Sequence, residues 1–392
     1  MKRLQGTMLL LAALALGACG PGPIYIGVML DPGGVDAAGL GAMEINFKDG
    51  VDGRPVRIRP FRLQPTTTEA EILDTLRVWA EDSSVVAAIV SSGNSSATTV
   101  SAALAKGGLP HLYATAEAAS VTLDANRFSL APPAGMEGEF LAEQAPLRAD
   151  ARVAVMYADM EYALALREGL VARLTELGVP VTAEVSYPRE TDEAQLFALV
   201  AEITESSPNI VYFIGEVDVL TVVEPRVRSD MPRAVLVSSS RAESRYLYAN
   251  PDEYYTGLRF VRFVDVRSGT PRMREYVFRN TSWTGNQTTS RDAIIYDGMM
   301  MIAESLRGRG GEDTDEDLLK ANERAAVRDF LAALGGARSA YDGIAGPTAF
   351  TLPGNSAPRE FNFVEVAPNA VVTSRDMEPE FLSESSPSVE TP

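Results

Sequence analysis

Short apolar runs and amphipathic segments alternate along most of the chain. The apolar runs have the length and composition of buried strands, and they lie at 24–30, 85–90, 151–158, 209–215 and 233–240. The segments between them carry apolar residues at helical spacing, at 37–47, 68–82, 162–178 and 192–206. Strands that alternate with helices in this way predict an α/β fold with mostly parallel sheets.

This strand and helix pattern occurs twice. The first set ends with a strand at 109–115, and the second begins at 151. We therefore expect two similar Rossmann-like lobes rather than one large sheet. Towards the end, a long helix at 291–308 precedes a segment at 343–366 that has the pattern of a hairpin. Residues 376–392 are rich in Glu, Ser and Pro, which predicts a disordered acidic tail.

The N-terminus has the pattern of an export signal. Lys2 and Arg3 precede an uncharged apolar run at 8–16 that is too short to span a bilayer. The following LGAC sequence resembles the bacterial lipoprotein box, which implies removal of residues 1–18 and a diacylglycerol on Cys19. Gly rather than Asp follows this cysteine, so we expect a lipid anchor in the outer membrane in preference to the cell membrane. No other cysteine is present, which excludes disulfides and cysteine-based sites.

The net charge of the chain narrows the classes of molecule that it can bind. A formal net charge of -18 disfavours binding to nucleic acid and to anionic membrane surfaces. One segment, at 259–279, interleaves arginines with aromatic residues. Alternation along a strand would send these arginines outward and Phe260 and Phe263 inward. We therefore expect this segment to belong to the fold and not to a nucleic-acid site.

The strand-to-helix segment 88–104 carries small polar residues at its joint, where residues 91–96 read SSGNSS. Such a turn can expose a nucleophile, hold a phosphate, or bind a small ligand with hydroxyls and helix N-terminal amides. A Ser95 hydrolase would need His111, the only histidine, which begins an apolar strand and is expected to be buried there. Neither glycine-rich phosphate motif is present at this turn.

The sequence gives only weak support for a calcium site. Asp313, Asp315 and Asp317 imitate the start of a calcium loop, but Leu318 and Arg324 replace the required Gly and Glu. We therefore expect no enzyme, no metal site and no cofactor. Non-covalent capture remains, because hydroxyls and main-chain amides between two lobes suit a small zwitterion or carboxylate.

The order of these segments resembles the type I periplasmic binding proteins, specifically the branched-chain amino-acid (Leu/Ile/Val) receptors of ABC importers. The segments that carry the resemblance are 24–30, 50–58, 91–116, 152–170, 293–306 and 343–350. It implies a small-molecule ligand, a permease partner, and closure of the lobes around the ligand.

The resemblance also implies lobes that are not contiguous in sequence. A three-segment hinge would join a first lobe of 24–144 plus 263–345 to a second lobe of 145–262 plus 346–372. The closed form of such a receptor is the form that docks on the permease.

The same resemblance implies which individual residues contact the ligand. Asn94 or Ser95, together with Ser96, match the carboxylate-binding serine turn of the family. Thr115 and Ala116 match its second contact in the first lobe, and Tyr162 matches the tyrosine that covers the ligand from the second lobe.

Three positions depart from the family pattern. Glu117 replaces a threonine that helps to hold the ammonium group, Glu216 replaces an aromatic residue, and Ser240 replaces the acidic partner of the ammonium. We expect a small polar, amino-bearing solute that is not necessarily a branched-chain amino acid. The alternative for Glu117 and Glu216 is a pair of hydrated or arginine-paired rim carboxylates. The alternative function is an envelope lipoprotein that acts as a sensor or assembly partner without transport.

Overall fold

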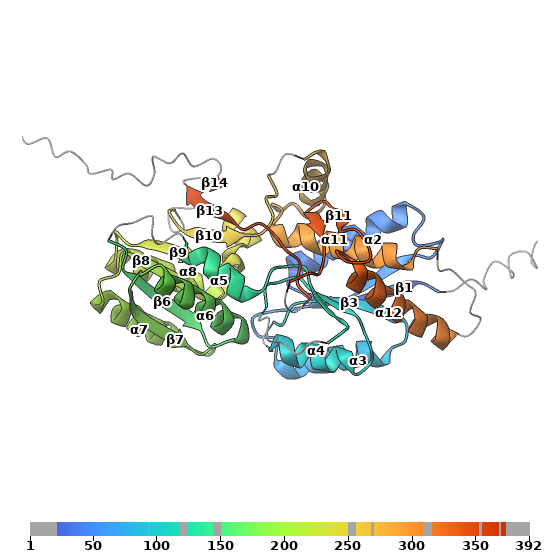
Figure 1. The fold of residues 1–392 in the computed structure, drawn as a ribbon, viewed down its shortest axis with the longest axis horizontal. Helices are drawn as coiled ribbons and strands as arrows, with labels where there is room; N and C mark the ends of the chain where they lie inside the picture. Colours follow the sequence, from blue (N-terminus) through green and yellow to red (C-terminus); the bar gives the residue numbers. More distant parts are fainter. Residues whose placement is uncertain are drawn as a thin grey trace, which may run out of the picture.

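The computed structural model describes residues 22–93, 95–117, 124–143, 150–249, 256–267, 270–308, 316–352, 355–367 and 370–373. They form two α/β lobes that lie side by side along the long axis of the molecule (Figure 1). Within these residues, no helix combines the length and hydrophobicity needed to cross a bilayer. The predicted signal peptide, Cys19 and the acidic tail 376–392 lie outside the described residues.

The first lobe is built on a five-stranded parallel sheet in the order β2-β1-β3-β4-β5. The strands are β1 (Ile24–Leu30), β2 (Val56–Arg62), β3 (Val85–Val90), β4 (His111–Tyr113) and β5 (Arg127–Ser129). Every residue of β3 is buried, because this central strand has helices on both faces. The parallel sheet predicted from its apolar runs is confirmed.

Six helices surround this sheet. They are α2 (Pro32–Phe47), α3 (Glu69–Glu81), α4 (Ala97–Ala105), α10 (Pro271–Thr284), α11 (Ser290–Leu306) and α12 (Glu316–Ala333). Alternate residues of β1 point to opposite faces: Val28 joins the apolar cluster that includes α2 and α11, and Met29 joins the cluster of α3 and α4. The sheet is therefore the middle layer of a three-layer lobe.

The second lobe contains a seven-stranded sheet in the order β14-β13-β10-β9-β8-β6-β7, in which β10, β13 and β14 pair antiparallel and the other pairs are parallel. Its strands are β6 (Val153–Ala158), β7 (Val181–Tyr187), β8 (Ile210–Ile214), β9 (Val235–Ser238), β10 (Arg259–Arg262), β13 (Asn362–Ala367) and β14 (Ala370–Thr373). Its helices are α5 (Ala134–Ala142), α6 (Glu161–Glu176), α7 (Glu193–Glu205), α8 (Val217–Asp230), the 3₁₀ turn η2 (Ser240–Ala242) and α9 (Arg245–Ala249).

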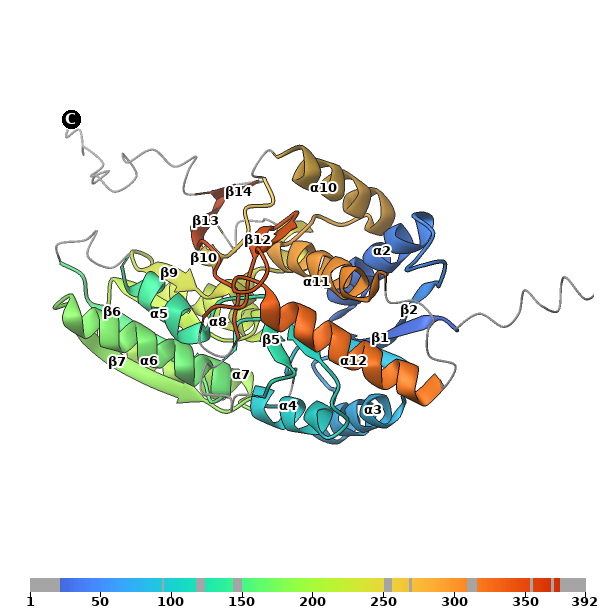
Figure 2. The same ribbon diagram turned by 45° about the vertical axis from the view of Figure 1, so that its right-hand side comes forward.

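The packing of α5 differs from the predicted division of the chain at residue 144. This helix lies against α6 of the second lobe, and the two remain adjacent when the molecule is turned (Figures 1 and 2). Gly138 permits the contact, since a Cβ there would lie 2.1 Å from the carbonyl oxygen of Leu166. The chain thus reaches the second lobe before α5, where the missing Cβ of Gly138 lets α5 pack closely on α6.

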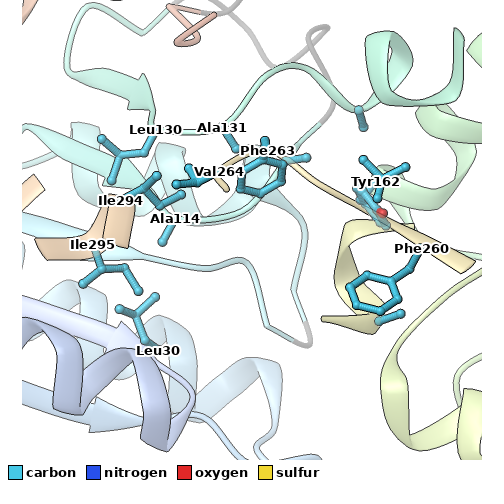
Figure 3. Packing of buried hydrophobic residues seen from close by; sticks show 14 of the residues in the cluster. Leu30, Ala114, Leu130, Ala131, Tyr162, Phe260, Phe263, Val264, Ile294 and Ile295 are labelled. Carbon is cyan, nitrogen blue, oxygen red and sulfur yellow. The ribbon is translucent and has the colours of Figure 1, made fainter. Parts of the chain in front are cut away.

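The lobes share a continuous apolar cluster at the place where the chain passes between them. Figure 3 shows Phe263 and Val264 between Leu130 and Ile294 on one side and Tyr162 on the other. Both Phe263 and Val264 are buried. Segments of the chain that are remote in sequence therefore pack together at the connection.

Two local expectations from the sequence were wrong. The segment 343–366 is not one hairpin: a short hairpin joins β11 (Tyr341–Gly343) to β12 (Gly346–Thr348), and β13 pairs instead with β10 and β14. Arg262 does not point outward, since its side chain is fully buried and Nη2 donates to Asp265 Oδ1 at 2.6 Å. An ion pair can hold a guanidinium inside a fold, which alternation along a strand cannot predict.

Candidate functional site

A cleft of about 360 Å³ lies between the two lobes. From the first lobe it is lined by Glu69, Ser92, Ser95, Ser96, Ala97 and Glu117. From the second lobe it is lined by Asp159, Met160, Glu161, Tyr162, Pro188, Arg189 and Glu190. These residues follow the carboxyl ends of strands or begin helices, which is where α/β sheets place their ligands.

The serine turn forms one wall of the cleft. β3 ends at Val90, and α4 begins at Ala97 with Ser96 as its N-cap, whose Oγ accepts a hydrogen bond from Thr99 N at 3.0 Å. Ser95 is 9% exposed, and its Oγ has no hydrogen-bond partner among the described residues. Asn94 lies outside the described residues. Ser95 thus offers a buried hydroxyl at the wall of the cleft, as the turn sequence leads us to expect.

Glu117 is the buried acid of this wall. Its Oε1 accepts hydrogen bonds from Thr115 Oγ1 at 2.7 Å and from Ser92 Oγ at 3.1 Å. Burial raises the pKa of Glu117, while these hydroxyls and the guanidinium of Arg241 counteract the rise. Thr115 and Ala116 do not line the main cleft but line a small hollow next to it, together with Ser240 and Arg241.

Arg241 is a buried charged residue of this region that the sequence analysis did not single out. It lies in η2 at the end of β9, and its side chain is buried. Its Cζ lies 3.9 Å from the centre of the Tyr162 ring, a cation–π contact. One end of the guanidinium forms an ion pair with Glu216, and Nη2 lies 3.5 Å from Glu117 Oε1. Burial opposes the charge, but the two carboxylates raise the pKa of Arg241 above its ordinary value.

Glu117 and Glu216 both lie against the guanidinium of Arg241, and Glu117 is buried rather than placed at a rim. Glu117 and Arg241 are separated by 124 positions and belong to different lobes. The only available sequence signal was the presence of two acids without an assigned cation in the expected cleft. That signal could not identify which of the arginines would pair with them.

Ser240 contacts a buried acid instead of a cleft ligand. Its N and Oγ donate to the carboxylate of Glu137, at 2.6 Å and 2.9 Å. Glu137 lies on α5 and is fully buried, and burial raises its pKa to about 7 against the effect of these hydrogen bonds. Nothing in the sequence around Glu137 distinguished it from a surface helix residue.

Three further polar contacts join the lobes around the cleft. Glu161 of α6 accepts hydrogen bonds from the first turn of α4, from Thr98 Oγ1 at 2.8 Å and from Thr98 N at 3.4 Å. Glu243 accepts a hydrogen bond from Ser290 N at 3.1 Å. Arg245 donates to Gly33 O at 3.0 Å and lies 3.3 Å from the carboxylates of Asp36 and Asp292. The structure thus holds the lobes together over the cleft with its own side chains.

The catalytic and metal alternatives find no assembled site in the part of the chain that the structure describes. His111 is fully buried, its Nε2 lies 3.1 Å from Ser101 Oγ, and burial lowers its pKa to about 4. The described residues contain no cluster of His, Cys, Asp or Glu that could hold a metal ion. Asp313 and Asp315 lie outside the described residues, and Arg324 donates to main-chain carbonyls, among them Gly107 O at 2.6 Å.

Comparison with solved structures identifies the fold. Isoleucine-bound LivJ, a branched-chain amino-acid transporter substrate-binding protein from Streptococcus pneumoniae, has a TM-score of 0.75 at 15% identity, covering 90% of this chain and 99% of its own. The leucine-binding protein LivK from Thermotoga maritima has a TM-score of 0.74 at 16% identity, covering 91% and 99%. A benzoate-bound solute-binding protein from R. palustris has a TM-score of 0.74 at 13% identity, covering 90% and 96%.

The sequence itself matches a family, although no curated protein matches it. The family model described as "Periplasmic binding protein" matches residues 26–370, which is most of the chain and includes every described residue that lines the cleft. The lobes, the sheet order and the interlobe cleft agree with the fold of the solved relatives. The chain therefore belongs to the periplasmic binding protein family and has the type I fold of the ABC-transporter substrate-binding proteins.

Proposed function

We propose that this protein captures a small polar, amino-bearing solute between its lobes and delivers it to an ABC importer. The observation that carries the proposal is the cleft of about 360 Å³, which both lobes line with polar groups. Its size is within the range of small-molecule sites. The family and the ligands named for its solved relatives, isoleucine among them, support solute capture.

The charge of the cleft supports an amino group on the solute. Five carboxylates line it, those of Glu69, Glu117, Asp159, Glu161 and Glu190, and Arg189 is the one arginine in the same lining. A low-dielectric cleft lined mainly by one sign of charge concentrates ligands of the opposite sign. The site is therefore better suited to a cationic or zwitterionic solute than to an anion.

We further propose that the protein is a lipoprotein of the cell envelope, anchored through Cys19 after removal of residues 1–18 and facing the periplasm. The charged start, the short apolar run and the LGAC sequence support this anchor. Mass spectrometry of the N-terminal peptide would measure the lipid directly. We expect C19S to remain in the soluble fraction, and an unmodified Cys19 in the wild-type protein would contradict the anchor.

A thermal-shift screen with amino acids, amides and polyamines tests the capture of a solute. A ligand at 100 times its dissociation constant stabilises the native state by about 2.7 kcal/mol, which is a measurable shift. We expect stabilisation by at least one amino-bearing compound. No shift with any cationic or zwitterionic solute would contradict the proposal.

The alternative function, a sensor or assembly partner without transport, is favoured by one observation. Arg241 and Glu161 bridge the lobes through side chains of the chain itself. Uptake of a radiolabelled form of the compound found in the screen separates the two functions. Deletion of the gene should abolish high-affinity uptake if the protein serves an importer and should leave uptake unchanged if it does not.

A further inference from the structure

We propose that the cleft selects a small amine or diamine that carries no carboxylate of its own, because side chains of the second lobe already occupy both charged positions that would hold a zwitterion. This inference rests on the proposed function and narrows the class of its ligand. It makes Arg241 and Glu161 the residues that determine specificity.

The position for a ligand carboxylate is occupied. The first turn of a helix attracts anions through its free N–H groups and its dipole. At α4 two of these groups already have partners: Thr98 N donates to Glu161 and Thr99 N donates to Ser96 Oγ. Thr98 Oγ1 also donates to Glu161, at 2.8 Å. A ligand carboxylate at this helix would have to displace Glu161 or lie beside its negative charge.

The inner position for a ligand ammonium is also occupied. Glu117 is the buried carboxylate of the cleft, and the guanidinium of Arg241 lies 3.5 Å from it. The same guanidinium pairs with Glu216 and covers the ring of Tyr162. These three neighbours are those that would bind a cation from solution. The guanidinium of Arg241 thus takes the position that the ammonium group of a ligand would otherwise occupy.

The rest of the cleft still attracts positive charge. Glu69, Asp159 and Glu190 line it, and among the described residues their carboxylates form no ion pair. The hydroxyl of Ser95 lines the same cleft, is buried, and has no partner within the described chain. A small amine could pair with these carboxylates and donate a hydrogen bond to Ser95 without competing for either occupied position.

Titration calorimetry and thermal shift with putrescine, L-leucine and benzoate test the inference. We expect putrescine to bind at least about tenfold more tightly than either other compound, a difference of about 1.4 kcal/mol. We also expect its affinity to fall as salt is added, because the rim carboxylates are solvent-exposed. Tighter binding of L-leucine would overturn this inference and leave the proposed function intact. Binding of benzoate alone would overturn both the inferred class of ligand, an amine, and the proposed amino-bearing solute. No binding by any solute would count against the proposal that the protein captures a solute.

The Arg241→Ala variant tests directly whether the guanidinium of Arg241 occupies the position of a ligand ammonium. The variant exposes Glu117, Glu216 and the Tyr162 ring, so methylguanidinium should bind to it at least about tenfold more tightly than to the wild-type protein. Arg167→Ala is the matched control, because Arg167 also pairs with a carboxylate, Glu184, and lies over a tyrosine ring in the second lobe. Equal methylguanidinium binding in the wild type and in R241A would overturn the role of Arg241.

Glu161→Gln gives an independent readout if R241A does not fold. Glutamine keeps the shape of the side chain but removes its charge from the first turn of α4. L-leucine should then bind at least about tenfold more tightly, and putrescine more weakly, than to the wild-type protein. An unchanged ratio of the two affinities would contradict the occupied carboxylate position.

Discussion

At the scale of single residues, the polar interior of this protein is determined by a few buried carboxyl groups. Glu117, Glu137, Asp292 and Asp297 are all buried, and burial raises the pKa of each. Glu137 and Asp297 accept hydrogen bonds from segments remote in sequence, those of Ser240 and Ile344, while Glu117 and Asp292 also have donors close in sequence, Thr115 and Thr289. Such groups bind protons more tightly in the folded than in the unfolded chain, which makes stability depend on pH.

Glu137→Gln should reduce this pH dependence. The pKa of Glu137 is about 7 in the folded protein against an ordinary 4.5, so its stabilising contribution is complete below pH 4.5 and is lost as the pH rises through 7. The wild type should lose up to about 3 kcal/mol of unfolding free energy through this group over that range. Urea denaturation on both sides of the range measures the loss. This loss should be smaller in E137Q than in the wild type, and in the exposed control Glu139→Gln it should equal that of the wild type. An equal loss in the wild type and E137Q would contradict the role of Glu137 in the pH dependence.

Ser95→Ala should separate binding from stability. The Ser95 hydroxyl has no partner among the described residues, so its removal should leave the free energy of unfolding of the ligand-free protein unchanged or slightly higher. Loss of a hydrogen bond to the ligand should weaken binding by roughly two- to tenfold. Ser129→Ala is the control, since the Ser129 hydroxyl donates to Ala131 O at 2.8 Å and its loss should cost about 1 kcal/mol of stability. Destabilisation in S95A as large as in S129A would show that Ser95 is a structural residue.

At the scale of elements, the contact between α5 and α6 depends on glycine. A Cβ at Gly138 would lie 2.1 Å from Leu166 O and 2.7 Å from Leu170 N, and both are backbone atoms that cannot move alone. A Cβ at Gly169 would likewise meet Gly135 O at 2.2 Å. The two helix backbones therefore approach closely at two points, which holds α5 in the second lobe.

Gly138→Ala should separate these helices and destabilise the second lobe. Overpacking at such a contact typically lowers the free energy of unfolding by about 1–3 kcal/mol. Urea denaturation measures this loss. The matched control is Gly135→Ala on the same helix, where an added Cβ has only an ordinary contact of 3.7 Å with Ala165 O. Alanine also has the higher helix propensity, so G135A should be neutral or stabilising. Equal effects of the two substitutions would contradict a close helix contact at Gly138.

At the scale of the whole molecule, we expect contacts between the lobes to control closure. Arg245 of α9 reaches Gly33, Asp36 and Asp292 of the first lobe through one guanidinium. Arg241, Glu161 and Glu243 also connect the lobes through charged groups. We expect the energies of these polar contacts to set the balance between open and closed forms, since a two-state equilibrium shifts by the difference in contacts.

Arg245→Ala should favour the open form. Hydrogen bonds to charged groups contribute about 1.5–3 kcal/mol, enough to change the open population by about tenfold or more. Small-angle X-ray scattering of the ligand-free variant should then give a larger radius of gyration than the wild type. Arg279→Ala is the control, because Arg279 pairs with Glu44 at 2.7 Å within the first lobe. An unchanged radius in R245A would exclude Arg245 from control of closure.

The sequence by itself determined the class of fold and the location of one wall of the cleft. Apolar runs and helical spacing are local patterns, so they predicted parallel strands such as β1 and β3, and the serine turn ahead of α4. A local pattern also placed Tyr162 at the start of a helix that follows a strand. The order of these elements along the chain carried the resemblance, and the resemblance added the family.

Only the tertiary structure decided how charge is arranged in the cleft. Arg241 pairs with a carboxylate 124 positions away, and Glu161 reaches α4 across 63 positions. The burial of Glu137 likewise depends on Ser240, which is 103 positions away. A charged side chain is held inside a protein by the groups that surround it in space, and the order of residues does not show which distant groups those are. The hydrophobic pattern therefore predicts where the lobes form, and their packing decides which charges remain for a ligand.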